Sequence, residues 1–144
     1  MARQGFIRGF PSAQSGVAAV EFAILTPVFL LMLMGMLAYG VYFGAAHSVQ
    51  QIAADAARTS IAGLNADERN TLVGAFITRN AKDYVFIDAS KVSFSIGDKP
   101  DDTSQYLVTI RYDASGLPIW SLNIPLPSPG MVIHYSSTIR KGGI

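Results

Sequence analysis

The chain has 144 residues, no cysteine, and 11 basic residues against 10 acidic ones. Without cysteine it can form no disulfide, no zinc–thiolate site and no cysteine nucleophile. The balanced charge offers no electrostatic footprint for nucleic acid.

The first sixteen residues predict a short cytoplasmic leader. Arg3 and Arg8 are basic, no acidic residue precedes Glu21, and Pro11 interrupts any helix there. Basic residues beside an apolar segment mark the side that stays in the cytoplasm. We therefore expect a membrane protein with a cytoplasmic N-terminus and an exported C-terminal domain.

Residues 22–46 predict a membrane-spanning helix. None of these 25 residues is Asp, Glu, Lys, Arg or His. At about 1.5 Å per residue, the run spans roughly 38 Å, more than the ~30 Å hydrocarbon core of a bilayer. Its eleven Leu, Ile, Val and Phe residues contribute roughly −0.3 to −0.6 kcal/mol each, which outweighs about 2.5–3.5 kcal/mol for Glu21. We assign the transmembrane helix to residues 17–46, with Tyr39 and Tyr42 in the outer aromatic belt.

Four residues within this helix bear on its shape and packing. Pro27 lacks an N–H group and predicts a bend near residues 23–27. Gly40 and Gly44 form a G-x-x-x-G pattern, with Gly35 nearby, which lets a second helix approach closely in lipid. Glycine is also common in membrane helices that pack against nothing in particular, so both interpretations stay open.

Helical character continues beyond the apolar segment to about Ala62. A narrow face at helical spacing is formed by Val49, Ile52, Ala53, Ala56 and Ser60. A single helix from Gly16 to Ala62 would measure roughly 70 Å. Asn65 followed by Glu68 then predicts the start of a second helix, which an apolar stripe carries to about Ala81.

After Lys91 the pattern changes to the alternation of β-strands. Alternating residues at 92–96 and 106–112 flank a turn and predict an antiparallel hairpin, and a third strand is expected at 131–141. Residues 113–130 hold four prolines and predict an unusually apolar loop that covers the core or contacts a neighbour. The predicted fold class is α+β: a long transmembrane helix extends into an exported domain, 47–144, with a second helix and an antiparallel sheet.

The sequence carries no pattern typical of an enzyme. It lacks the nucleophile-elbow, zinc-protease, phosphate-loop and dinucleotide motifs. His47 and His134 lie far apart in the chain, and neither has a neighbouring carboxylate pattern. Asp98, Asp101 and Asp102 do not follow a calcium-loop spacing and fit a solvated turn. We expect no enzymatic activity, cofactor or metal.

The start of the apolar segment contains a more specific pattern. Gly16 stands five residues before Glu21, and Phe22 opens the apolar run. The stretch SGVAAVEFAILTP resembles the start of TadE-like minor pseudopilins of tight-adherence (Flp) pili, which are part of the type IV filament superfamily. The matching positions are Ser15, Gly16, Ala18, Ala19, Val20, Glu21, Phe22, Ala23 and Pro27.

The resemblance implies that a membrane prepilin peptidase cuts after Gly16. Such a cut would create a new α-amine on Val17, with an ordinary pKa near 7.7–8.0. Glu21 lies four residues on and could pair with the amine of its own chain or of a neighbour, with Phe22 completing the processing and assembly motif. The alternative is that Glu21 simply lies at headgroup depth.

The leading hypothesis is therefore a minor pseudopilin that assembles or primes a Tad/Flp adhesion pilus. The partners that the resemblance implies are the peptidase, the major Flp pilin, other minor pseudopilins, the platform proteins and membrane lipid. One alternative is an uncleaved single-pass protein whose periplasmic domain binds a ligand or the cell wall. Another is a secreted domain released by cleavage of a signal peptide, although the apolar run is long for a signal.

Overall fold

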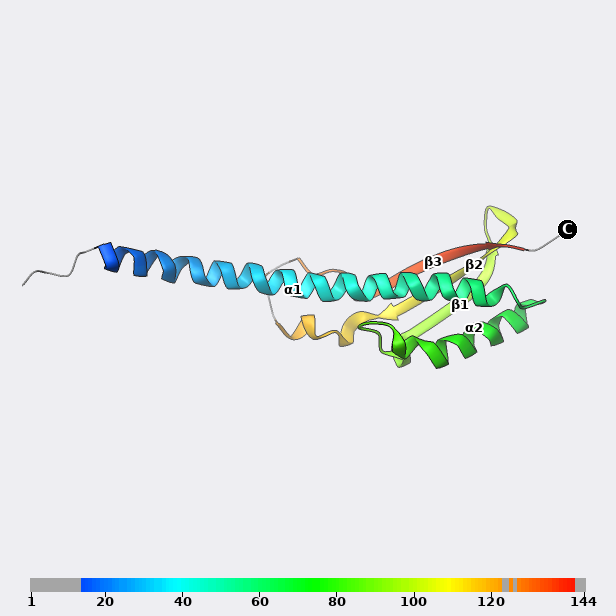
Figure 1. Ribbon diagram of the computed structural model, residues 1–144. Coiled ribbons are helices and arrows are strands. Elements are labelled where there is room, and N and C mark those ends of the chain that lie inside the picture. Colours follow the sequence, from blue (N-terminus) through cyan, green and yellow to red (C-terminus); the bar gives the residue numbers. More distant parts are fainter. Residues whose placement is uncertain (1–13, 123–124, 126, 142–144) are drawn as a thin grey trace, which may run out of the picture.

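The computed structural model describes residues 14–122, 125 and 127–141. A single long helix, α1 (Gln14–Ser60), forms the spine of the molecule, and a small domain packs against its C-terminal half (Figure 1). The predicted α+β fold class is confirmed. Residues 123–124, 126 and 142–144 of the expected exported domain and most of the leader, residues 1–13, lie outside the described residues.

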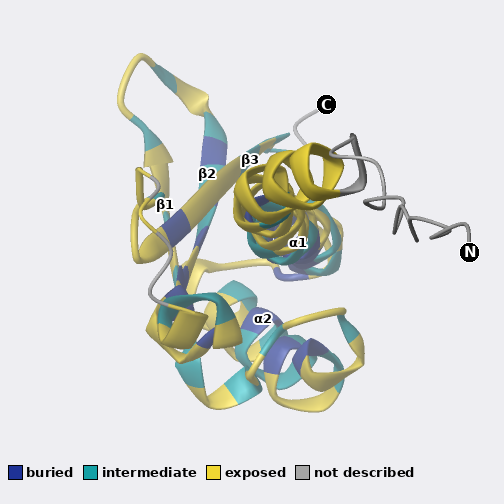
Figure 2. Ribbon diagram, turned by 90° about the vertical axis from the view of Figure 1, so that its left-hand side faces the viewer, coloured by how far each residue is buried: buried dark blue, intermediate teal, exposed yellow. Residues whose placement is uncertain are grey.

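Helix α1 has 47 residues and passes through Pro27 without interruption. Its length is roughly 70 Å at 1.5 Å per residue, as expected. Buried positions recur at helical spacing only in its second half, where Val49, Ile52 and Ala56 are completely covered. The N-terminal half projects from the domain with its side chains exposed (Figures 1 and 2).

Helix α2 (Ala66–Asn80) begins at the predicted cap and packs beside α1. The Asn65 side chain accepts a hydrogen bond from the backbone N–H of Glu68 at 2.9 Å. The Glu68 carboxylate in turn accepts from the backbone N–H of Leu64 at 2.8 Å. These bonds satisfy donors that the helix start and its approach would otherwise leave unpaired. The buried face of α2 presents Val73 and Ile77 to the core.

The sheet has three antiparallel strands in the order β1–β2–β3: β1 (Val92–Lys99), β2 (Asp102–Asp113) and β3 (Val132–Arg140). Figure 2 shows α1 lying against one face of this sheet. Residues Tyr106, Val108, Ile110 and Tyr112 of β2 are buried on that face, and the residues between them are more exposed. The period-two prediction for all three strands is confirmed.

The turn of the hairpin is shorter than the sequence predicted. Gly97, Asp98 and Lys99 belong to β1 rather than to the turn, and the register shifts between Asp98 and Lys99. A strand ending in glycine and charged residues lacks the apolar alternation on which the prediction relied. Asp98 is instead paired with Lys141, beyond the end of β3, at 2.6 Å.

Short 3-10 helices occupy the connections between the larger elements. They are η1 (Ala81–Asp83), η2 (Ala89–Lys91), η3 (Ala114–Gly116) and η4 (Pro118–Leu122). The last two lie in the predicted proline-rich loop. Leu117 between them is buried, and Ile119 and Trp120 pack against the core. This part of the loop therefore covers the domain core, which was one of its two expected roles.

Candidate membrane and assembly segment

The N-terminal half of α1 is apolar on every side, and most of its large side chains are exposed among the residues that the structure describes. Val17, Phe22, Leu25 and Phe29 expose between 58 and 72% of their surface. In the described part of the chain, one helix is long and apolar enough to cross a membrane, and none of its most apolar window is buried. The segment therefore fits a single-pass membrane anchor, since exposed apolar surface of this extent is stable in lipid and not in water.

Gly16, Val17 and Glu21 lie on the first two turns of α1. Residues four apart lie one above the other on a helix, so the Glu21 side chain lies on the same face as the backbone of Val17. A Cβ atom added to Gly16 would meet no atom within 4 Å. Among the described residues, nothing therefore requires glycine at position 16.

The first two turns are followed by the one proline of α1. Pro27 cannot donate a hydrogen bond to the carbonyl of Ala23. The neighbouring Thr26 side chain donates to the carbonyl of Phe22 at 2.6 Å. This bond satisfies a hydroxyl that would otherwise lie unpaired in an apolar environment. The expected bend near residues 23–27 is not a break, because α1 continues through it.

The three candidate packing glycines differ in their surroundings. A Cβ atom on Gly40 would meet nothing within 4 Å, whereas one on Gly44 would lie 2.9 Å from two ring carbons of Phe86. Gly35 is buried. The Gly44 end of the G-x-x-x-G pattern therefore accommodates a side chain of the same polypeptide, and the Gly40 end is open.

Phe86 reaches Gly44 from an unusual backbone conformation. Its φ angle is +61°, a region that bulky residues rarely adopt, at a cost of roughly 1–2 kcal/mol. Its neighbourhood holds it there. The Ser48 hydroxyl donates to the carbonyl of Val85 at 2.8 Å, and the Tyr112 hydroxyl donates to the carbonyl of Phe86 at 3.1 Å. The loop after α2 is thus fixed against α1 and against the sheet.

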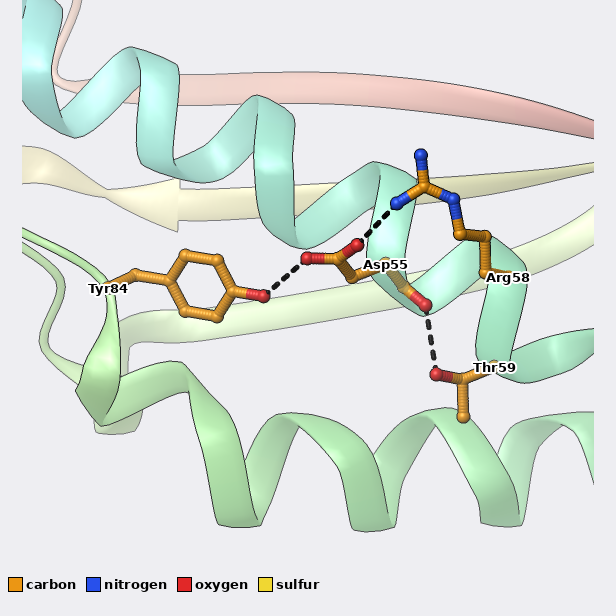
Figure 3. A network of polar contacts seen from close by, with 4 residues as sticks. All are labelled: Asp55, Arg58, Thr59 and Tyr84. Carbon is orange, nitrogen blue, oxygen red and sulfur yellow. Dashed lines mark hydrogen bonds and ion pairs between the residues drawn. The ribbon is translucent and has the colours of Figure 1, made fainter.

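A polar network fastens the start of the same loop to α1 (Figure 3). The Tyr84 hydroxyl donates to one oxygen of Asp55 at 2.7 Å, and Arg58 pairs with the other oxygen at 2.7 Å. Thr59 donates to the Asp55 carbonyl at 2.9 Å. Partial burial, and then the bond to Asp55, raise the pKa of Tyr84 to about 12. The network keeps the phenol protonated and has the character of a structural clamp.

The connection between β2 and β3 contacts α1 at Tyr39, which is closer to the apolar half of the helix than Asp55. The Tyr39 hydroxyl donates to the carbonyl of Pro127, and η4 contacts α1. The sequence placed Tyr39 in an aromatic belt but gave no indication of this contact. Nor did it single out Phe86, although the apolar run Tyr84–Ile87 between charged residues was an available signal.

Comparison with known proteins bears on the N-terminal part of the chain. Residues 16–58 match the family model described as TadE-like protein. The match begins at Gly16 and covers most of α1, so the resemblance noted from the sequence is confirmed over that segment. No curated protein and no solved structure matches the chain significantly. The match points to involvement in a Tad pilus and to association with its components.

Proposed function

We propose that the chain is a non-enzymatic minor pseudopilin that helps to assemble or prime a Tad/Flp pilus. A prepilin peptidase removes residues 1–16, and α1 stays in the inner membrane with its N-terminus in the cytoplasm and its domain in the periplasm. The observation that carries the proposal is the family match, which starts at the glycine of the proposed cut. The expected partners are the peptidase, the major Flp pilin, other minor pseudopilins and the platform proteins.

The exposed first turns of α1 support the processing step. Gly16 lies at the start of the helix with open space around it, so a peptidase can reach its backbone without displacing a side chain of the fold. Arg3 and Arg8 precede it on the side that we assign to the cytoplasm. A side chain at residue 16 would obstruct the access of the peptidase active site to the carbonyl of the bond that is cut.

Cleavage would give Glu21 a partner. The new amine of Val17 lies one helical turn before the carboxylate, within reach of the same chain or of an adjacent one. Between packed helices such a pair is poorly hydrated, and removing one member leaves the other uncompensated, at about 3–5 kcal/mol. Glu21 would therefore set the register between subunits, with the exposed Phe22 beside it in the contact.

The mature mass tests the processing step. Wild type, Gly16→Val and Gly40→Val are each produced with the cognate peptidase, and the membrane-bound product is weighed by mass spectrometry. We expect wild type and Gly40→Val to lose residues 1–16 and Gly16→Val to keep them. Gly40 is a matched control because a Cβ at either glycine meets nothing within 4 Å. A full-length wild-type product would support the uncleaved, membrane-anchored binding domain instead.

The role of Glu21 is tested separately by cross-linking in membranes. Glu21→Ala should insert and be cleaved, because removal of a carboxylate only favours partition into lipid. The yield of its cross-links to pilin partners should fall sharply. Glu21→Gln keeps the shape of the side chain but loses its charge, so its cross-linking yield should fall in the same way. Wild-type cross-linking by both variants would show that Glu21 does not set the register.

A further inference from the structure

The end of the domain nearest the exposed half of α1 carries an apolar surface made by two loops. We call it the apolar collar, and it consists of Val85, Phe86, Ile119, Trp120, Leu122 and Met131. Val85 and Met131 expose 62 and 58% of their surface, and Phe86 and Leu122 expose 46 and 40%. Large apolar side chains gathered at one end of a small domain indicate a contact surface.

The two loops that form the collar contact α1 between Tyr39 and Gly44. Phe86 covers Gly44, and the Tyr39 hydroxyl bonds to the carbonyl of Pro127. Both anchor points fall inside the charge-free run 22–46. Counted from Glu21 at the inner surface, a ~30 Å hydrocarbon core takes up about 20 helical residues and ends near residue 41. The collar therefore lies where α1 leaves the hydrocarbon.

The amino-acid composition of the two loops agrees with a position at the membrane surface. Residues 114–133 form a run of twenty without Asp, Glu, Lys, Arg or His, and the run comprises the connection between β2 and β3 and the first two residues of β3. The shorter run 84–87 is also uncharged and lies between Asp83 and Asp88. Phe86 lies against Gly44 of α1, and η4, which carries Trp120, also contacts α1. Tyr39 and Tyr42 precede Gly44 by less than two helical turns. Tryptophan and tyrosine are the residues enriched at the interface between lipid and water.

Several polar groups of the two loops are satisfied by partners within the described part of the chain. The indole N–H of Trp120 donates to the carbonyl of Ala114 at 2.6 Å. The carbonyls of Val85 and Phe86 accept from Ser48 and Tyr112. Because these three groups need no water, they can lie against an apolar phase without being left unpaired.

We propose that the collar enters the boundary between headgroups and acyl chains in the outer leaflet of the bilayer that α1 spans. Phospholipid is then a second contact of the exported domain, continuous with the membrane contact of α1. The inference rests on the membrane anchoring of α1, and it requires neither cleavage after Gly16 nor a role in the pilus. Resistance of the protein to alkaline extraction from membranes tests the anchoring on its own.

Trp120 is the only tryptophan of the chain, so its fluorescence reports on the collar directly. The full chain is reconstituted into phosphatidylcholine–phosphatidylglycerol vesicles that contain lipids brominated near the headgroup or near the bilayer centre. We expect shallow bromines to quench Trp120 strongly and deep bromines to quench it weakly. The control is Trp120→Phe combined with Leu64→Trp. Leu64 is 88% exposed beyond the far end of α1, roughly 30 Å along the helix from Tyr39, and should not be quenched. Equal quenching at the two positions would overturn the proposal.

Spin labels give a second reading that does not depend on Trp120. The natural chain has no cysteine, so Val85→Cys, Leu122→Cys and the distal control Ile61→Cys each provide a single labelling site. In the same vesicles, labels at Val85 and Leu122 should be relaxed by oxygen, which concentrates in lipid, and hardly by a water-soluble nickel chelate. The Ile61 label should show the reverse. Nickel access at the collar would contradict the proposal, and so would labels immobile and closed to both reagents, which would indicate contact with another protein chain.

Discussion

Three of the five residues before Gln50, namely Ala45, Ser48 and Val49, are part of the core of the C-terminal domain, and a truncation there should destabilise it severely. A periplasmic domain assigned by polarity would begin at residue 47, and a fragment from Gln50 would contain every strand and α2. In the structure Ala45 and Val49 are completely buried, and Ser48 is 5% exposed and bonded to Val85. We therefore compare fragment 50–144 with fragment 38–144.

The expected loss follows from these three residues. Burial of the Val49 side chain contributes about 1.5–3 kcal/mol, and the methyl group of Ala45 adds about 0.8 kcal/mol. The bond between Ser48 and Val85 adds about 1 kcal/mol. The total of about 3–5 kcal/mol compares with about 5–15 kcal/mol for the whole stability of a domain of roughly 100 residues. The shorter fragment should thus be marginal or unfolded at room temperature.

Urea unfolding of both fragments, in the same mild detergent, measures the difference. Circular dichroism and Trp120 fluorescence follow the transition. With a slope of about 1–3 kcal/mol per molar urea, the midpoint of fragment 50–144 should lie at least about 1 M lower. Val49→Ala in the longer fragment should fall between them, with a loss of about 2 kcal/mol. Equal midpoints for the two fragments would show that α1 before Gln50 does not stabilise the domain.

Three smaller effects can be measured on the longer fragment. Asn65→Ala removes the cap of α2 and should cost about 1 kcal/mol, whereas Asn70→Ala on the exposed face should cost little; equal melting temperatures would contradict this. Tyr84→Phe should cost about 1 kcal/mol, because it removes a hydrogen bond to the partly exposed carboxylate of Asp55. Folding raises the pKa of Tyr84 from 10.0 to about 12, so its contribution is complete below pH 10 and is lost as the pH rises toward 12. The stability difference between wild type and Tyr84→Phe should therefore shrink over that interval, and a difference that is constant with pH would refute the assignment.

The larger elements could be predicted because each follows a simple periodicity. The face formed by Val49, Ile52 and Ala56 repeats at helical spacing and is buried. The alternation from Tyr106 to Tyr112 is the buried face of β2. Asn65 and Glu68 hydrogen-bond as the capping pattern requires. In each case local sequence and tertiary packing favour the same structure.

The contacts of the two loops could not be predicted in this way. The positive φ of Phe86 depends on two hydrogen bonds from distant parts of the chain. Ser48 donates to the carbonyl of Val85, 37 residues further along, and Tyr112 donates to the carbonyl of Phe86. The bond from Tyr39 to Pro127 joins residues 88 apart. No periodicity encodes such pairs, and without the structure the G-x-x-x-G pattern gave no sign that Phe86 covers Gly44. The candidate segment could therefore be predicted from its sequence motif, whereas the contacts that the two loops make with α1 could not.

The absence of a linker in α1 has a mechanical consequence for the proposed role. The helix runs unbroken from the exposed Val17 to the buried Ser60, so the domain cannot change its depth without moving the membrane segment. Along this helix the collar lies roughly 35 Å from Glu21, a distance that about 23 residues at 1.5 Å span. A subunit drawn out of the bilayer into a filament would carry the collar out of lipid at the same time that the Glu21 region enters the hydrocarbon. The two events are coupled through a rigid element, so the collar would oppose extraction until contacts with neighbouring subunits replace its contacts with lipid.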